Sequence, residues 1–128
     1  MDKPFDEWNE DKKRVHARET TPLYHTREIW WANLGLNVGY EQDGTGEHYK
    51  RPVLVLRGLS RHVCIIVPLT TSTKRDRFYI DIGIVAGKSA TAIISQIRLV
   101  DTRRLVEKIA TLDHTHFEAI RKAARALL

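Results

Sequence analysis

The sequence predicts a mainly β protein with flanking helices, in which about six short antiparallel strands form a small, strongly bent sheet or barrel. Short apolar runs recur along the chain, and glycine, proline or charged turns separate them. Both ends of the chain instead place apolar side chains at helical spacing among charged ones. No internal repeat and no low-complexity tract interrupts this pattern.

Size, charge and cysteine usage limit the class of protein. The 128 residues suffice for one domain, and no apolar run approaches the roughly 18 residues that a membrane-spanning helix needs. The acidic N-terminus lacks the apolar core of a secretory signal. Cys64 is the one cysteine and lies in an apolar run, so we expect a buried, inert thiol and a reducing, cytoplasmic location. The net charge of +5 favours anionic partners.

The N-terminal segment is predicted to be helical over residues 4–17. Pro4 suits the first helical position, and Phe5, Trp8 and Val15 fall near one face. We interpret this face as a packing patch, with base stacking as the alternative. The residues that follow contain Thr-Thr-Pro, which is typical of a linker.

The predicted strands are rich in β-branched and aromatic residues and end at turn signals. Proline cannot donate to a β-ladder, so we expect Pro52 at the first position of its strand and Pro68 at the end of the next. Two glycines indicate a loop over residues 83–89, and a long polar loop over 37–50 leads to Arg51. The predicted strands cover residues 28–34, 52–56, 62–67, 78–82, 90–100 and 107–111.

Two aspartates mark the starts of helical segments in the C-terminal part of the chain. Asp101 is expected to cap a short turn over residues 102–105, and Asp113 to cap the final helix. Apolar side chains recur along that helix at three- and four-residue spacing. They are Phe117, Ile120, Ala124 and Leu127.

One pair of polar residues is expected to meet at a rim of the sheet. Arg51 opens one strand, and Thr70 follows the end of the next strand. Antiparallel pairing brings these two positions together. A guanidinium fork and a hydroxyl suit a phosphodiester and its developing negative charge. The alternative is a solvated strand-end arginine beside an ordinary strand-end threonine.

Motifs for several other chemistries are absent. The chain has no glycine-rich phosphate loop, no Cys-x-x-Cys, no His-Glu-x-x-His and no Gly-x-Ser-x-Gly. Its six histidines are scattered, and His114 and His116 are two residues apart, so they do not share a helix face. We therefore expect neither a metal site nor a cofactor.

Five segments, in order and with plausible spacing, resemble the MazF/PemK (Kid) family of toxin endoribonucleases. The resemblance begins near residue 27 and runs to the C-terminus, which implies a toxin domain over 27–128 and an added helical extension and linker over 1–26. The segments are Glu28-Ile-Trp-Trp-Ala-Asn-Leu-Gly35, Gly39-Tyr-Glu-Gln42, Arg51-Pro-Val-Leu-Val-Leu56, Val67-Pro-Leu-Thr70 and Ser95-Gln-Ile-Arg-Leu-Val-Asp101.

This resemblance implies a curved SH3-like barrel of the plasmid-toxin kind, a homodimer, and metal-independent cleavage of single-stranded RNA that a cognate antitoxin blocks. The family's catalytic arginine matches Arg51, and its catalytic threonine matches Thr70. Its Glu-Gln pair, in the loop that shapes the RNA groove, matches Glu41 and Gln42.

The sequence departs from the family where many members carry an acidic residue, because Ser95 stands there. A serine does not act as an acid or base at neutral pH, so the group that moves the proton has to be another one. We hypothesise that His48 does so, because imidazole titrates near neutrality. The alternatives are Glu41 as the base and His48 as a solvated loop histidine.

Basic and aromatic residues around the same rim are predicted to bind RNA. Cations there would follow the phosphate backbone and make affinity fall with salt, while a tyrosine could stack on an unpaired base. The predicted RNA-binding residues are Glu41, Gln42, Tyr49, Lys50, Lys74, Arg75, Arg77, Gln96 and Arg98. Solvated turn charges are the alternative for the cations.

Two other functions fit the same fold. The related CcdB toxins keep the barrel but act by binding, so a non-catalytic binding toxin is the first alternative. A family member with weakened activity is the second. The pair Arg51 and Thr70 favours the nuclease, whereas Ser95 leaves room for a binder.

Overall fold

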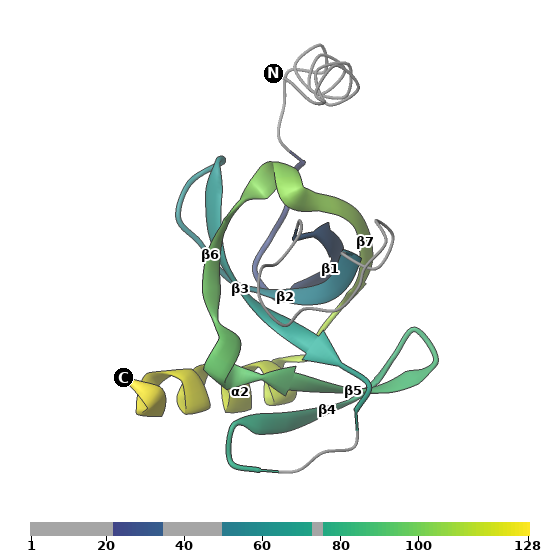
Figure 1. Ribbon diagram of the computed structural model, residues 1–128, viewed down its shortest axis with the longest axis vertical. Coiled ribbons are helices and arrows are strands. Elements are labelled where there is room, and N and C mark those ends of the chain that lie inside the picture. Colours follow the sequence, from purple (N-terminus) through teal and green to yellow (C-terminus); the bar gives the residue numbers. More distant parts are fainter. Residues whose placement is uncertain (1–21, 35–49, 73–75) are drawn as a thin grey trace.

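The computed structural model describes residues 22–34, 50–72 and 76–128 (Figure 1). The helix predicted over residues 4–17 lies outside these ranges, as does all of the predicted polar loop except Lys50.

The described chain forms a seven-stranded sheet, two short 3₁₀ helices and one α-helix, so the predicted mainly β fold is confirmed. The helices are η2 (Ile94–Gln96), η3 (Thr102–Arg104) and α2 (His114–Leu127). The strands are β1 (Glu28–Asn33), β2 (Lys50–Gly58), β3 (Val63–Thr70), β4 (Tyr79–Val85), β5 (Lys88–Ile93), β6 (Arg98–Asp101) and β7 (Leu105–Thr111).

The sheet is antiparallel throughout and strongly curled. Its strand order is β4–β5–β3–β2–β1–β7, and β6 pairs with β3. Figure 1 shows β1, β2, β3, β6 and β7 curling round a common centre, with the β4–β5 hairpin below them beside α2. The curl turns one face of the sheet inward and leaves the other for the helix.

Two apolar clusters occupy these two faces. In β2, Val53 and Val55 belong to one cluster and Leu54 to the other, because successive side chains of a strand point to opposite faces. We call the side of the first cluster, within the curl, the barrel face, and the side that packs against α2 the helix face. The barrel-face cluster is Trp30, Ala32, Leu34, Val53, Val55, Cys64, Ile66, Val100 and Leu105. The helix-face cluster is Ile29, Leu54, Val67, Leu69, Ile82, Ala90, Ala92, Ile94, Leu112, Phe117 and Ile120.

The two strand prolines do not lie where the sequence predicted. Pro68 is fully buried in the interior of β3, which continues to Thr70. On one side of β3, pairing with β6 stops at Ile66 and pairing with β5 begins at Leu69. Pro68, which has no N–H, falls between these two pairings. At this position no neighbouring strand on that side of β3 requires a backbone donor. Pro52 is the third residue of β2, level with Trp31 of β1, and does not begin the strand.

The loop predicted over residues 83–89 is also wrong, since most of it is strand. β4 and β5 are joined by a two-residue turn, Ala86 and Gly87, with φ of 51° and 82°. Positive φ at both positions is what a tight type I′ hairpin requires. Gly83, with φ of 87°, lies at a register shift within the hairpin and marks a β-bulge.

The single strand predicted over residues 90–100 is divided. η2 separates β5 from β6, which raises the strand number from the predicted six to seven. Both predicted caps are confirmed: Asp101 accepts a hydrogen bond from the Arg103 N–H at 2.8 Å, and Asp113 accepts one from the His116 N–H at 3.0 Å.

Candidate functional site

The candidate site lies at the end of the β2–β3 hairpin remote from its turn. We call this the open end, formed by Lys50, Arg51, Leu69 and Thr70. The register Leu54↔Val67 and Val53↔Pro68 runs toward it. Arg51 and Thr70 each lie two residues beyond the pair Val53↔Pro68, so continuing the same register places the two level with each other.

Both side chains belong to the barrel face. Arg51 pairs with Ala32 of the barrel-face cluster and follows the alternation of Val53 and Val55. Thr70 follows Ile66 and Pro68 in the same way on β3. Both residues are half-buried. Among the residues that the structure describes, none forms an ion pair or a hydrogen bond with the Arg51 guanidinium.

The Thr70 hydroxyl has a defined backbone partner. Its Oγ1 accepts a hydrogen bond from the Ser72 N–H at 3.1 Å. A hydroxyl has two lone pairs and one proton. Accepting from Ser72 therefore leaves the Thr70 proton to be donated to a bound anion.

The strand register extends this row onto the β4–β5 hairpin. Thr70 pairs with Thr91 of β5, and Thr91 pairs with Asp81 of β4. The row Arg51, Thr70, Thr91, Asp81 crosses four neighbouring strands. Sequence reasoning missed Thr91 and Asp81. The alternation of Asp81 with Ile80 and Ile82 could have predicted which face of β4 Asp81 lies on. Its cross-strand neighbours depend on the strand register, which the sequence alone does not give.

The other predicted RNA-binding residues that the structure describes are exposed but do not form one cluster. Lys50 precedes Arg51 and therefore points to the opposite face. Arg77 lies before β4, with its guanidinium carbon 4.9 Å from the centre of the Phe78 ring. Gln96 ends η2, and Arg98 begins β6 opposite Ile66, on the barrel face. Ser95 is exposed in η2.

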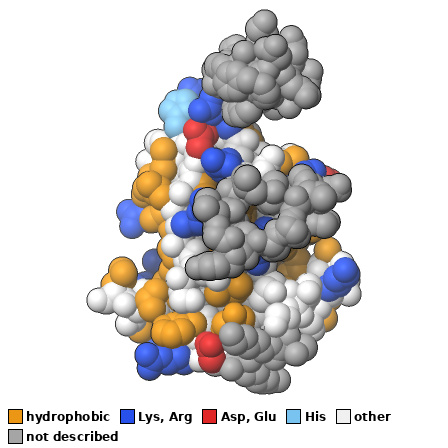
Figure 2. Space-filling model, in the orientation of Figure 1, with side chains coloured by type: hydrophobic (Ala, Val, Ile, Leu, Met, Phe, Trp, Pro, Cys, Tyr) orange, Lys and Arg blue, Asp and Glu red, His pale blue; other side chains and the backbone are white. Residues whose placement is uncertain are grey.

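Several predicted site residues lie outside the described residues, and their roles stay predictions. They are Glu41, Gln42, His48, Tyr49, Lys74 and Arg75. On the face shown in Figure 2, the visible charged side chains are more often basic than acidic, in keeping with the net charge of +5.

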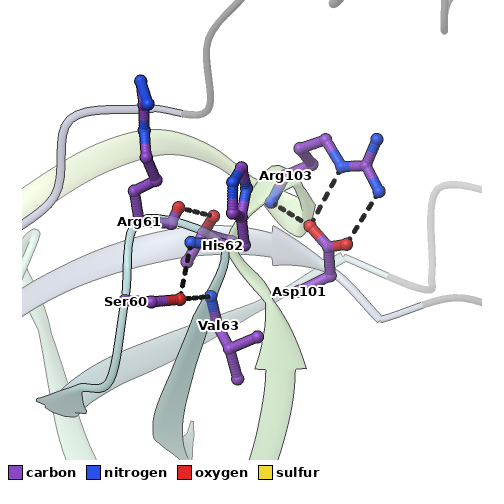
Figure 3. Close-up of polar contacts among 7 residues, drawn as sticks. Ser60, Arg61, His62, Val63, Asp101 and Arg103 are labelled. Carbon is purple, nitrogen blue, oxygen red and sulfur yellow. Dashed lines mark hydrogen bonds and ion pairs between the residues drawn. The ribbon is translucent and has the colours of Figure 1, made fainter.

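The other end of the hairpin, residues 58–63 with η3, is built differently, and we call it the turn end (Figure 3). Ser60 Oγ accepts hydrogen bonds from the N–H groups of His62 and Val63 at 3.0 and 3.2 Å. Thr102 is fully buried and donates to the Arg61 carbonyl at 2.6 Å. The Arg103 guanidinium reaches both carboxylate oxygens of Asp101, at 3.1 and 2.8 Å. The hydroxyls of Ser60 and Thr102 and the guanidinium of Arg103 are thus used within the fold.

Tyr24 seals the turn end. Its Oη donates to the Ser60 carbonyl at 2.6 Å, and its ring packs against the barrel-face cluster. A Cβ at Gly58 would lie 2.6 Å from the Tyr24 hydroxyl oxygen, so only glycine at this position lets the tyrosine ring approach this closely. The turn end is therefore closed by packing as well as by hydrogen bonds.

Cys64 is a buried structural residue, as predicted. Its side chain is inaccessible within the barrel-face cluster. Burial, with a smaller contribution from the Asp101 charge, raises the pKa of the thiol to about 11. The thiolate is the reactive form of cysteine, so this thiol is not a nucleophile.

Two further classes of feature are absent from the part of the chain that the structure describes. It contains no group of three or more His, Cys, Asp or Glu side chains that could hold a metal ion. It also contains no helix that is both long and apolar enough to cross a membrane.

Solved structures share this fold. A MazF from Deinococcus radiodurans matches with a TM-score of 0.66 and 23% identity, over 83% of this chain and 96% of that one. The Mycobacterium tuberculosis toxin MazF-mt6 matches with a TM-score of 0.61 and 16% identity, over 78% and 94%. A mycobacterial endoribonuclease in complex with its cognate antitoxin matches with a TM-score of 0.61 and 13% identity, over 81% and 93%. None of the curated proteins matches the chain.

The family model agrees with the fold. The model for the PemK-like, MazF-like toxin of type II toxin–antitoxin systems matches residues 25–128, which is most of the chain and includes the whole curled sheet and α2. The chain therefore belongs to the PemK-like, MazF-like family of type II toxins.

Proposed function

We propose that this toxin is a metal-independent endoribonuclease that cleaves single-stranded messenger RNA at specific sequences in the cytoplasm. Membership of the family and the endoribonucleases among the matching structures support this class of activity. The observation on which the proposal depends is the level placement of Arg51 and Thr70 on one face, with the guanidinium unpaired among the described residues.

The proposed reaction uses the RNA as its own nucleophile. The ribose 2′-oxygen attacks the adjacent phosphorus, and the bond from phosphorus to the 5′-oxygen breaks. The products are a cyclic 2′,3′-phosphate and a free 5′-hydroxyl. The 2′-hydroxyl loses a proton and the leaving oxygen gains one, so atoms and charge balance without a metal or cofactor.

Arg51 and Thr70 have distinct proposed roles in this step. The Arg51 guanidinium binds two phosphate oxygens and stabilises the charge that develops on the phosphorane. Thr70 donates its hydroxyl proton to a phosphate oxygen, while Ser72 holds its oxygen in place. His48, with Glu41 as the alternative, is a candidate for proton transfer from the segment outside the described residues.

RNA binding and assembly complete the proposal. Arg77, Gln96 and Arg98 are proposed to contact the RNA together with Lys50, and with Gln42, Tyr49, Lys74 and Arg75 of the undescribed segments. A cognate antitoxin is proposed to neutralise the toxin, since matching structures include MazE–MazF complexes. The toxin is proposed to act as a homodimer.

Incubation of the purified protein with a long RNA in the presence of a chelator tests the proposal. We expect cuts with 5′-hydroxyl ends, and a loss of roughly 100-fold or more in rate for Arg51→Ala, because one main stabiliser of the developing charge is removed. Arg57→Ala is the matched control, since this exposed arginine lies near the other end of β2. Absence of cleavage by the folded wild-type protein, or full activity of Arg51→Ala, would overturn the proposal.

A non-catalytic binding toxin is the second candidate, and the exposed Ser95 favours it because no carboxylate stands at that position. In this case the folded protein would bind a partner through the open end without cutting RNA. The same assay therefore separates the two candidates.

A further inference from the structure

We propose that Asp81 is the general base of the RNA cleavage reaction. The inference rests on the proposed nuclease function and adds to it a residue that the sequence did not indicate. Three observations support it: the strand register, the face on which Asp81 lies, and the hydrogen bond that orients its carboxylate.

The register connects Asp81 directly to the candidate site. Asp81 pairs with Thr91, and Thr91 pairs with Thr70, so one strand separates the carboxylate from the catalytic threonine. Neighbouring strands lie about 4.8 Å apart, which puts the Cα atoms of Asp81 and Thr70 about 10 Å apart. A phosphodiester with its ribose fits between two side chains at this separation.

The face of Asp81 is fixed by its neighbours. Ile80 and Ile82 pack with the helix-face cluster, so Asp81 between them points to the opposite side of β4. On β5, Ala90 and Ala92 belong to the same helix-face cluster, and Thr91 points away from it. Asp81, Thr91, Thr70 and Arg51 therefore stand in one row on one face.

One oxygen of the Asp81 carboxylate is held by a backbone hydrogen bond, and the other has no partner among the described residues. Its Oδ1 accepts a hydrogen bond from the Gly83 N–H at 2.9 Å, across the bulge that Gly83 forms with its φ of 87°. Among the described residues, none pairs with Oδ2. Asp81 is exposed, so a bound RNA can reach that oxygen.

Three other carboxylates that the structure ties down are not available in this way, and Asp76, which is held like Asp81, lies outside the row. Glu28 is buried and bonded to donors of three residues, His25, Trp30 and Lys108. Asp101 and Asp113 are capping residues with basic partners. Within the row itself, Arg51 is a cation and the two threonines are neutral, so only Asp81 can accept a proton.

In the proposed step, Asp81 Oδ2 takes the proton of the 2′-hydroxyl as the 2′-oxygen attacks phosphorus, and Arg51 stabilises the phosphorane. The bond to the 5′-oxygen then breaks, and a water molecule protonates that oxygen. The proton on Asp81 returns to the resulting hydroxide, which restores the enzyme.

The substitution Asp81→Asn tests the role of this carboxylate. The asparagine amide keeps an oxygen that can accept from the Gly83 N–H but cannot take a proton. We expect kcat for RNA cleavage to fall about 100-fold or more, and the limb of the pH–rate profile in which activity rises with pH to disappear. Asp81→Glu, which keeps a carboxylate, should retain the pH-dependent limb at a reduced rate.

Asp76→Asn is the matched control. Asp76 is also exposed, and its Oδ1 accepts from the Phe78 N–H at 2.8 Å, the same two-residue spacing as at Asp81. It lies in the turn before β4, outside the row. We expect the Asp76→Asn variant to cleave RNA at a rate within about twofold of wild type and with an unchanged pH profile, because surface substitutions of this kind have small effects.

The outcomes separate this inference from the proposed function. An active wild type that Arg51→Ala inactivates, with an unchanged rate and pH profile in Asp81→Asn, would overturn the role of Asp81 alone. A reduced affinity of Asp81→Asn for RNA with an unchanged pH limb would also overturn the role of Asp81 as general base. That result describes a residue that only contacts a nucleobase of the bound RNA. Loss of the pH limb in His48→Ala or Glu41→Gln would assign the base to that residue and would also overturn the role of Asp81. An inactive wild type would overturn the nuclease proposal itself.

Discussion

The two ends of the β2–β3 hairpin have similar composition and opposite construction. Each has an arginine and a hydroxyl residue on neighbouring segments: Arg51 and Thr70 at the open end, Arg61 and Thr102 at the turn end. At the turn end, Thr102 is fully buried and bonded to the Arg61 carbonyl, and Tyr24 covers the turn. At the open end, both residues are half-buried and level across two paired strands.

This difference teaches that residue types do not define a site. A hydroxyl whose proton is already donated to a buried carbonyl stabilises the fold, since breaking that bond leaves a buried group unsatisfied. A hydroxyl that only accepts from the backbone still has a proton to donate. The turn end is thus an internal control for what the open end is proposed to do.

The largest expected effect comes from removing one hydroxyl at each end. Thr70→Val should lower the rate of RNA cleavage by about 100-fold with little loss of stability, because a donor to the phosphate is lost. Thr102→Val should leave the rate unchanged but lower the free energy of unfolding by about 1–3 kcal/mol, because the Arg61 carbonyl loses its buried donor. Cleavage kinetics and urea unfolding measure both. Equal effects of the two substitutions on the rate would end the distinction between the ends.

A buried carboxylate sharpens the contrast with Asp81. Glu28 is 7% exposed, and its oxygens accept from Trp30 Nε1 at 2.9 Å and from the His25 N–H at 2.9 Å, with Lys108 Nζ at 3.3 Å. Burial disfavours the charge, but these hydrogen bonds outweigh it and hold the pKa of Glu28 below its ordinary value of 4.5. The charged carboxylate is therefore part of the folded state.

Glu28→Gln should accordingly lower the free energy of unfolding by about 1–3 kcal/mol at neutral pH. Because the folded pKa is lowered, the stabilisation is present above pH 4.5 and is lost as the pH falls through the folded pKa. Urea unfolding of both proteins from pH 7 to pH 3 measures this, and the difference between them should shrink toward the acid end. A difference that stays constant with pH would contradict the assignment.

The basic residues offer a smaller, binding-level comparison. Arg98 lies on the barrel face of β6, opposite Ile66, whereas Arg57 lies near the turn end of β2. Arg98→Ala should reduce the salt dependence of RNA affinity by about 0.7 in the log–log slope, as expected for one lost phosphate contact. Arg57→Ala should not. Titration of a fully 2′-O-methylated RNA, which lacks the attacking hydroxyl, measures affinity without cleavage. Identical slopes for both variants would remove Arg98 from the RNA path.

The smallest effect is expected at the capping pair of the turn end. The side chains of Asp101 and Arg103 are 41% and 40% exposed, and the hydrogen bond from Arg103 is the largest cause of the lowered pKa of Asp101. Asp101→Asn keeps an acceptor for the Arg103 N–H and loses only a partly solvated ion pair. We expect a loss of about 0.5 kcal/mol in thermal unfolding at low salt and less at high salt. A loss above about 2 kcal/mol would mean that this pair organises the turn end.

Local signals were well predicted because they act over a few residues. Asp101 and Asp113 cap the helical segments as expected, since a cap needs only the next three residues. The errors involved non-local context. Pro68 was expected to end a strand, but β3 continues because β6 and β5 share its edge on either side of the proline. The turn at Ala86 and Gly87 was hidden because one of its positions is not a glycine.

By itself, the sequence determined the alternation within each strand, the caps, and the placement of Arg51 and Thr70 at the same end of a short hairpin. Only the tertiary structure decided which strand lies beside Thr70. The curled sheet buries two different faces, so β5 and β4 must add to β3 with their alanines and isoleucines toward α2. That packing requirement, which no short segment contains, brings Thr91 and Asp81 into the row of Arg51.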